Sequence, residues 1–160
     1  MRREFGNVLC NLIGKDKKVH LVILDTGFRI FDKIIKEHPA NYHNFGVTEQ
    51  ASIGVASGMA LEGLRPYLYT ITPFILERPF EQIKLDIVEQ NARVKLVGFW
   101  HYPHDGPTHR TKDVKGLCNL LGIKLYEPQD AKETREMILE DYYKNDGPAF
   151  FSLKKDISYK

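Results

Sequence analysis

Apolar residues follow two alternating patterns along the 160-residue chain. In the first pattern apolar positions recur three and four residues apart, which predicts a helix with one buried face. In the second, short continuous apolar runs predict buried strands. The helical pattern covers residues 3–13, 28–37, 48–62, 79–88, 112–121 and 130–143. The apolar runs cover residues 19–24, 42–45, 67–71, 94–100, 123–126 and 149–153.

Particular residues mark the ends of these predicted helices. Gly14 is expected to stop the first helix, and Gly63 lies where a helix commonly ends in a left-handed glycine. Asp130 and Glu133 have the spacing of an N-cap with a capping box. The second helix is expected to turn four apolar side chains inward, namely Phe28, Phe31, Ile34 and Ile35.

The alternation of strands and helices predicts an α/β fold with a mainly parallel sheet and helices on both faces. The length suits one domain over residues 1–160. Sites in such sheets lie beyond the carboxyl ends of the strands. Three stretches fall there, namely the loop leading into Glu49, the turn at Thr72–Arg78 and the loop at 101–109.

Composition narrows the class of protein. The formal net charge is +2 and the basic residues are spread along the chain, which gives no electrostatic case for nucleic-acid binding. No window approaches 18 apolar residues and no signal peptide is visible, so neither a membrane span nor secretion is expected. Cys10 and Cys118 form no CxxC pair, which favours a reduced, cytoplasmic protein.

The stretch at residues 44–63 combines an acid with small residues at helical spacing. Gly54 and Gly58 are four apart, and because glycine disfavours a helix interior, we expect this face to lie against another backbone. Glu49 stands in the first turn, where the helix dipole favours its charged form, whereas burial favours its neutral form. Glu49 is therefore either a catalytic acid or a residue that only helps to start the helix.

The loop at residues 101–109 holds three of the six histidines. One interpretation is a solvated turn, and a second is a zinc site using His101 and His104, although no cysteine or HExxH spacing accompanies them. The interpretation that we favour is a substrate-binding or proton-transfer loop, since histidine exchanges protons near neutral pH. It uses His101, His104, Asp105 and His109, and we assign no metal-ligating residues to the chain.

The stretch around Phe74 leaves two interpretations open. Phe74 is either part of the core or a platform on which a flat ligand stacks, and Arg78 either pairs with a neighbouring acid or serves that ligand. Spacing alone does not decide between them.

Four stretches together resemble the pyrimidine-binding domain of transketolases and deoxyxylulose-phosphate synthases. GVTEQASIGVASGMALEG at 46–63 is similar to the family's Glu-Gln or Glu-His helix, and TPFILERPFEQIKLDI at 72–87 to its Phe-containing turn. DGPTH at 105–109 matches the substrate loop, and NDGPAFFSLKK at 145–155 resembles the closing strand. The resemblance covers nearly the whole chain in the right order.

The resemblance implies thiamine diphosphate as the cofactor. Glu49 would then hydrogen-bond N1′ of the aminopyrimidine, which activates the cofactor for removal of its C2 proton. Phe74 matches the aromatic residue that stacks on the pyrimidine, and Arg78 is placed beside it as a further cofactor-binding residue. The cofactor performs the difficult step, and the protein orients and polarises it.

The resemblance also implies a role for the histidine loop. Asp105 and His109 would contact the hydroxyl groups of the donor substrate near the reacting carbon, with His109 as the second catalytic residue. His101 and His104 lie in a shortened part of the loop and are assigned to substrate binding.

Two departures from the family pattern shape the expected function. The chain has no Gly-Asp-Gly motif, so Mg²⁺ and the diphosphate would be held by a partner subunit that carries it, in a hetero-oligomer such as a dimer of heterodimers. Ser152 stands near the position where relatives carry an arginine that grips a sugar phosphate. We expect one subunit of a split transferase of carbohydrate metabolism that moves a two-carbon ketol unit. A subunit of a 2-oxo-acid decarboxylase and a non-catalytic subunit are the alternatives.

Overall fold

The computed structural model describes residues 1–99 and 106–154. Its centre is a six-stranded sheet in the order β2-β1-β3-β4-β6-β5, and every neighbouring pair is parallel. The strands are β1 (Val19–Ile23), β2 (Tyr42–Asn44), β3 (Arg65–Ile71), β4 (Lys95–Phe99), β5 (Lys124–Tyr126) and β6 (Ala149–Leu153). The predicted α/β fold with a parallel sheet is confirmed.

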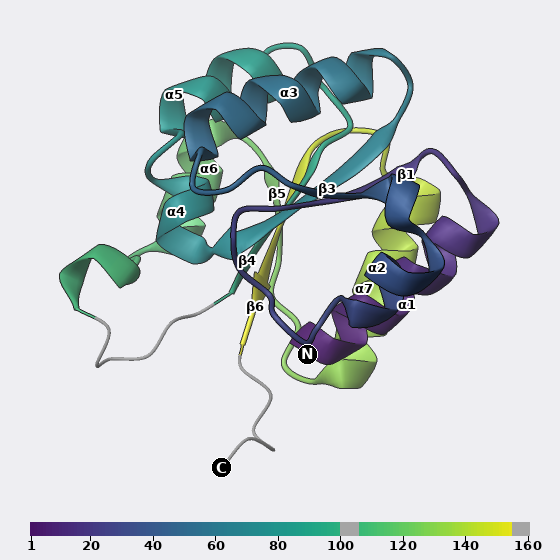
Figure 1. Cartoon of the computed structure of the whole chain (residues 1–160). Helices are drawn as coiled ribbons and strands as arrows, with labels where there is room; N and C mark the ends of the chain where they lie inside the picture. The colour runs from purple at the N-terminus through teal and green to yellow at the C-terminus, as the bar shows by residue number, and fades with distance from the viewer. Residues whose placement is uncertain (100–105, 155–160) are drawn as a thin grey trace.

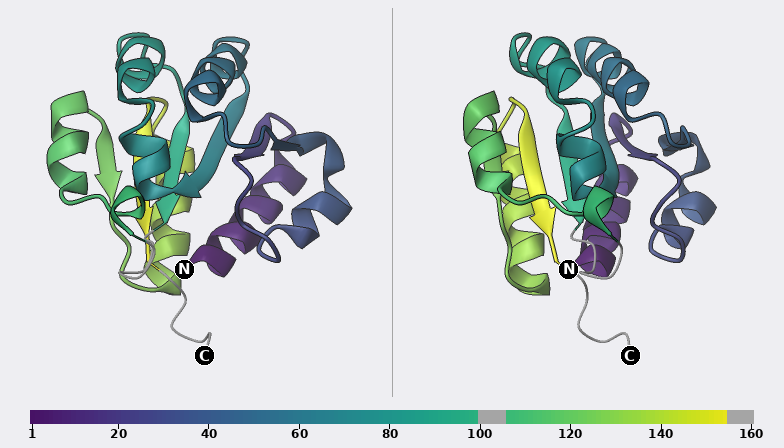
Figure 2. Two further views of the ribbon diagram at one scale, coloured as in Figure 1. Left: turned by 60° about the vertical axis from the view of Figure 1, so that its left-hand side comes forward. Right: turned by 90° about the vertical axis from the view of Figure 1, so that its left-hand side faces the viewer.

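Helices cover both faces of the sheet (Figures 1 and 2). One layer holds α1 (Arg2–Lys15), α2 (Asp32–Glu37) and α7 (Ala131–Lys144). The other holds α3 (Glu49–Leu61), α4 (Thr72–Leu76), α5 (Phe80–Gln82), the π-helical turn η2 (Ile83–Val88) and α6 (Val114–Leu121). Two 3₁₀ turns, η1 (Pro39–Asn41) and η4 (Pro107–His109), complete the helical segments of the described residues.

The strands divide their side chains between two apolar cores. In β1, Leu21 and Ile23 pack into the core under α1, α2 and α7, whereas Val22 packs into the core under α3 and α6. This follows from the alternation of side chains along a strand. The central strands β1, β3, β4 and β6 are therefore buried on both sides, whereas the edge strands β2 and β5 are partly exposed.

The predicted helix over residues 28–37 is wrong at its start and in part of its buried face. Gly27 and Arg29 both have positive φ angles, 86° and 63°, which a right-handed helix cannot contain. The helix therefore begins only at Asp32. Phe28 is 77% exposed and Ile35 43% exposed, whereas the predicted burial of Phe31 and Ile34 is confirmed.

The predicted helix ends are partly confirmed. Asp130 accepts the amide of Glu133 at 2.8 Å and so caps α7, as its spacing predicted. Gly63 follows α3 with a φ angle of 83°. Gly14 does not stop α1, which continues to Lys15 because the packing of Leu12 and Ile13 outweighs the cost of one glycine, about 0.5–1 kcal/mol.

Within residues 1–99 and 106–154, every helix is too short or too polar to cross a lipid bilayer.

Candidate functional site

The predicted site stretches lie at one edge of the sheet. Glu49 begins α3 just after β2, Phe74 lies in α4 directly after β3, and His109 lies in η4 beyond the end of β4. Because all the strands are parallel, their carboxyl ends share this edge. The predicted location of the three stretches is confirmed for the residues that the structure describes.

The side chain of Asn44 fixes the loop that leads to Glu49. Its Oδ1 accepts the amide of Asp25 at 3.1 Å and that of Gly46 at 3.0 Å. Gly46 has a φ angle of 68°, a conformation that favours glycine. Thr48 Oγ1 then donates to the carbonyl of Phe45 at 2.9 Å. These bonds tie the end of β1 to the start of α3 and set where the Glu49 carboxylate lies.

Glu49 and Arg78 form an ion pair across this edge. Arg78 Nη1 lies 2.8 Å from Glu49 Oε1, and Gln50 Nε2 donates to the carbonyl of Arg78 at 3.5 Å. The carboxylate side chain is 9% exposed, whereas the guanidinium side chain is 41% exposed. The acid is thus covered, and its cation faces solvent.

Arg78 also covers the ring of Phe74. The guanidinium carbon lies 3.5 Å from the ring centroid, within the range of a cation–π contact. The ring of His109 approaches Phe74 with a centroid distance of 4.9 Å and an interplanar angle of 60°. His109 Nδ1 lies 2.9 Å from Thr108 Oγ1. Glu49, Arg78, Phe74 and His109 are therefore joined by successive contacts.

An open hollow of about 500 Å³ lies beside the carboxylate. It is lined by Val47, Thr48, Glu49, Gln50, Ala51 and Arg78. Val47 and Ala51 give it apolar walls, and Glu49 and Arg78 give it one charge of each sign. Such a lining suits a flat, partly polar ring with a hydrogen-bonding edge.

The structure brings together four of the predicted site residues, Glu49, Phe74, Arg78 and His109. His101, His104 and Asp105 lie outside the described residues, so their substrate-binding roles stay predictions and the alternative of a zinc site is untested. The stretch Thr72–Arg78 is not a simple turn. Residues 72–76 form α4, whose first turn accommodates Pro73 because the missing amide there has no helical partner.

Sequence reasoning gave Asn44 no role. The one local signal was an asparagine two residues before Gly46, a combination common in turns. Asn44 contacts both ends of the loop, and only the pairing of β1 with β2 brings Asp25 within reach.

The small-residue face of α3 is uncovered. The nearest atom to a Cβ built on Gly54 is Asp86 Oδ2 at 3.8 Å, and Gly58 has no atom within 4 Å. The expected contact with another backbone is therefore absent within residues 1–99 and 106–154. Val47, Val55 and Leu61 are 64%, 47% and 60% exposed on or next to α3. Such an apolar surface is typical of an interaction site.

Comparison with known proteins adds a family to this geometry. A family model described as "Transketolase, pyrimidine binding domain" matches residues 1–159. One subunit of the apulose-4-phosphate transketolase of Phocaeicola vulgatus is 30% identical, over 88% of this chain and 47% of that protein. A 1-deoxy-D-xylulose-5-phosphate synthase of a Synechococcus species is 30% identical, over 91% of this chain and 23% of that protein. The chain thus spans about half or less of the length of these relatives.

Solved structures share the fold. The structure titled "Split gene transketolase, inactive beta4 tetramer" superposes with a TM-score of 0.88 at 24% identity, over 99% of this chain and 52% of that one. The transketolase of Leishmania mexicana superposes with a TM-score of 0.81 at 19% identity, over 96% of this chain and 25% of that one. At these identities the likeness concerns the fold alone.

Proposed function

The chain belongs to the transketolase pyrimidine-binding domain family, and on that premise we propose that it is one subunit of a split, thiamine-diphosphate-dependent transferase that moves a two-carbon ketol unit. The observation that carries this proposal is a covered carboxylate, Glu49, at the carboxyl edge of the sheet, which one arginine, Arg78, joins to the aromatic ring of Phe74.

The residues of the hollow fit the aminopyrimidine half of this cofactor. Glu49 offers a covered acceptor, and the hollow is large enough for a six-membered ring. Phe74 does not line the hollow, but it contacts Arg78, which does, and it offers an aromatic face there. The sequence has no Gly-Asp-Gly motif for the diphosphate end, so we assign Mg²⁺ and the diphosphate to a partner subunit.

Each residue of the cluster takes one task in this proposal. When bound, thiamine diphosphate supplies the nucleophilic carbon that takes up and passes on the two-carbon unit. Glu49 holds a proton at N1′ of the pyrimidine, and Phe74 orients the ring. Arg78, which lies over Phe74, would serve as a further cofactor-binding residue. His109 donates to a hydroxyl group of the substrate, and the Asp105 carboxylate of the adjoining loop accepts from one.

The partner subunit in this proposal covers the apolar face of α3. Val55 and Leu61 are exposed there, and Gly54 and Gly58 leave room for a close approach. The relatives from Phocaeicola vulgatus and Actinobacillus succinogenes are each named as one subunit of a transketolase, which supports the existence of a second subunit here. A dimer of heterodimers and a cytoplasmic location remain predictions.

One contact favours a second candidate, a non-catalytic subunit. Arg78 contacts both the carboxylate of Glu49 and the face of Phe74, the two groups that the cofactor would need. A subunit that had lost turnover could keep these contacts permanently, because no cofactor would have to replace them. A subunit of a 2-oxo-acid decarboxylase is the alternative within enzymes, because it would use the same half-site.

The experiment that separates these functions is reconstitution. The chain is combined with a protein that carries Gly-Asp-Gly and is encoded next to it, in the presence of thiamine diphosphate and Mg²⁺. Transfer from a ketose donor to an aldehyde acceptor is the expected result. Release of CO₂ from a 2-oxo acid without such transfer would favour the decarboxylase. A stable complex without either activity would favour the non-catalytic subunit.

A further inference from the structure

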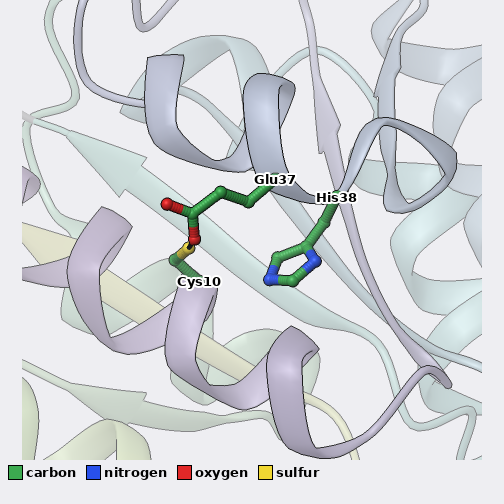
Figure 3. A group of neighbouring side chains, drawn as sticks. All are labelled: Cys10, Glu37 and His38. Carbon is green, nitrogen blue, oxygen red and sulfur yellow. Dashed lines mark hydrogen bonds between the residues drawn. The ribbon is translucent and has the colours of Figure 1, made fainter.

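A cysteine, a glutamate and a histidine meet between α1 and the end of α2, in the helical layer opposite α3 (Figures 1 and 3). One ligand atom from each of Cys10, Glu37 and His38 lies within 4.8 Å of the other two. Cys10 Sγ donates to Glu37 Oε2 at 3.7 Å. Figure 3 shows the imidazole of His38 turned toward the other two side chains.

The fold holds these residues in place. The helices α1 and α2 lead into β1 and β2, which are parallel neighbours, so both helices end at the same side of the sheet. Asn41 Nδ2 donates to the carbonyls of Lys17 and Val19, at 2.9 Å each, and so ties the segment after α2 to the segment after α1. A Cβ built on Gly14 would lie 3.7 Å from His38 Nε2, so the imidazole lies close over this glycine of α1.

The three donor atoms form a set that Zn²⁺ prefers. Zinc takes sulfur at about 2.3 Å and nitrogen or oxygen at about 2.0–2.2 Å in a tetrahedron, which places neighbouring ligand atoms about 3.5 Å apart. The sulfur and the carboxylate oxygen are 3.7 Å apart and need almost no movement, whereas the imidazole needs a small one. The exposed side of Glu37 offers a path for the ion.

Nearby charges are compatible with a cation. Lys33 Nζ lies 4.0 Å from Glu37 Oε2, but its side chain is 56% exposed and such a pair is weak, so the ammonium can turn to solvent. Lys17 is the other cation whose field reaches Cys10. Burial raises the pKa of the Cys10 thiol, so without a metal the thiol stays protonated and donates its hydrogen bond to Glu37. Metal binding would release that proton to solvent.

We propose that Cys10, Glu37 and His38 bind one Zn²⁺ ion, with water as the fourth ligand, as a clip that joins α1 to α2. The thiol loses its proton, the thiolate forms the bond to zinc, and no electron is transferred. Glu37 lies 27 residues after Cys10, a spacing that matches no short zinc motif, so the sequence alone does not indicate this site.

The test is a titration of the metal-stripped full chain with Co²⁺, a spectroscopic substitute for Zn²⁺, followed by displacement with Zn²⁺. The expected result is one equivalent bound, with a thiolate-to-cobalt charge-transfer band that Zn²⁺ abolishes. His38→Ala and Glu37→Gln should each weaken binding at least about tenfold, since even outer-shell partners of metal sites are worth about 10- to 100-fold. Cys10→Ser should remove the band.

Cys118→Ser is the matched control, because Cys118 is also buried but lies in α6, in the opposite layer. It should bind Co²⁺ as the wild type does. Glu37 is exposed, so Glu37→Gln keeps the fold and decides the matter even if Cys10→Ser fails to fold. The proposal is overturned if no charge-transfer band forms, if the band depends on Cys118, or if either Glu37→Gln or His38→Ala binds as the wild type does. None of these measurements of metal binding depends on transferase activity.

Discussion

Arg78 donates to Glu49 across 2.8 Å, from a position 29 residues further along the chain. The same guanidinium lies 3.5 Å from the centroid of Phe74. The acid and the ring that the proposed cofactor needs are therefore both in contact with one half-exposed arginine. Whether Arg78 strengthens or weakens cofactor binding therefore distinguishes a cofactor-binding residue from one that closes the site.

Arg78→Ala should change the affinity of the site and not the stability of the fold. The cation is exposed and the Glu49 carboxylate opens onto the hollow, where water can replace the lost partner, so the loss should cost about 1 kcal/mol of unfolding free energy. If Arg78 serves the cofactor, losing one charge-assisted hydrogen bond of about 1.5–3 kcal/mol should weaken binding at least about tenfold in the assembled enzyme. Isothermal calorimetry on the complex measures this.

Arg78→Lys is the matched control, because it keeps the charge but loses the planar fork and should recover only part of the affinity. Tighter cofactor binding by Arg78→Ala would contradict this prediction. It would mean that Arg78 closes the site.

The chain by itself should bind thiamine diphosphate weakly and turn nothing over. The reason is that the sequence carries no Gly-Asp-Gly motif for the diphosphate and its magnesium ion. Calorimetric titration of the isolated chain, with and without Mg²⁺, should give weak binding that the ion does not improve. Tight binding that requires Mg²⁺ would refute the division of the site between two subunits.

His109→Ala should lower turnover in the assembled enzyme and leave cofactor affinity nearly intact. His109 contacts the cluster at Phe74, and the proposal assigns it to the substrate. Loss of a hydrogen bond worth about 1.5–3 kcal/mol in the transition state predicts a decrease of about ten- to a hundredfold. Asp105→Ala is expected to behave alike.

Lys112→Ala, at an exposed position three residues after His109, serves as the control and should retain wild-type turnover. If the His109 variant instead lost cofactor affinity and kept its turnover per bound cofactor, the substrate assignment would be wrong.

Acid should destabilise the fold through two histidines of neighbouring strands. His20 Nδ1 lies 3.0 Å from His43 Nε2, and burial lowers the pKa of both, helped at His20 by the charge of His43. The unfolded chain therefore takes up protons first, at the ordinary pKa of 6.5. Stability is fully present above that value and is lost as the pH falls from it through the lowered pKa values.

Denaturant unfolding between about pH 8 and pH 5, the range in which histidine titrates, measures this effect. His20→Gln should show a smaller loss of unfolding free energy than the wild type over the same range. Equal losses in the two proteins would assign the acid sensitivity to other groups.

The sequence predicted those strand bounds and helix caps that depend only on residues close together along the chain. The apolar run over 149–153 coincides with β6, and Asp130 caps α7 at the predicted residue. Gly27 and Arg29 show where local signals fail. Their positive φ angles delay the start of α2, and apolar spacing alone extended that helix back to Phe28.

Contacts between distant segments were beyond the reach of the sequence alone. The motifs placed Glu49 and Arg78 in one site, but only the packing of the segment after α4 against α3 makes them an ion pair. Cys10 and Glu37 come together only because β1 and β2 are neighbours. Such contacts depend on the order of strands in the sheet, which spacing along the chain does not fix.

The central claim is that Glu49 activates the cofactor. Glu49→Gln keeps the shape of the side chain but removes the negative charge that a protonated N1′ requires. A hydrogen bond to a charged group is worth about 1.5–3 kcal/mol, and each 1.36 kcal/mol is about tenfold in rate, so turnover should fall at least about ten- to a hundredfold. Stability should change by at most about 1 kcal/mol, because glutamine keeps the shape of the side chain and the cation of the lost ion pair is 41% exposed.

The most direct measurement is the rate of proton exchange at C2 of thiamine diphosphate bound to the reconstituted complex. Glu62→Gln, an exposed acid just beyond the other end of α3, is the control and should exchange at the wild-type rate. The account predicts exchange in Glu49→Gln that is slower by at least about tenfold. Exchange at the wild-type rate in Glu49→Gln would contradict it and leave Glu49 as a residue that only begins the helix.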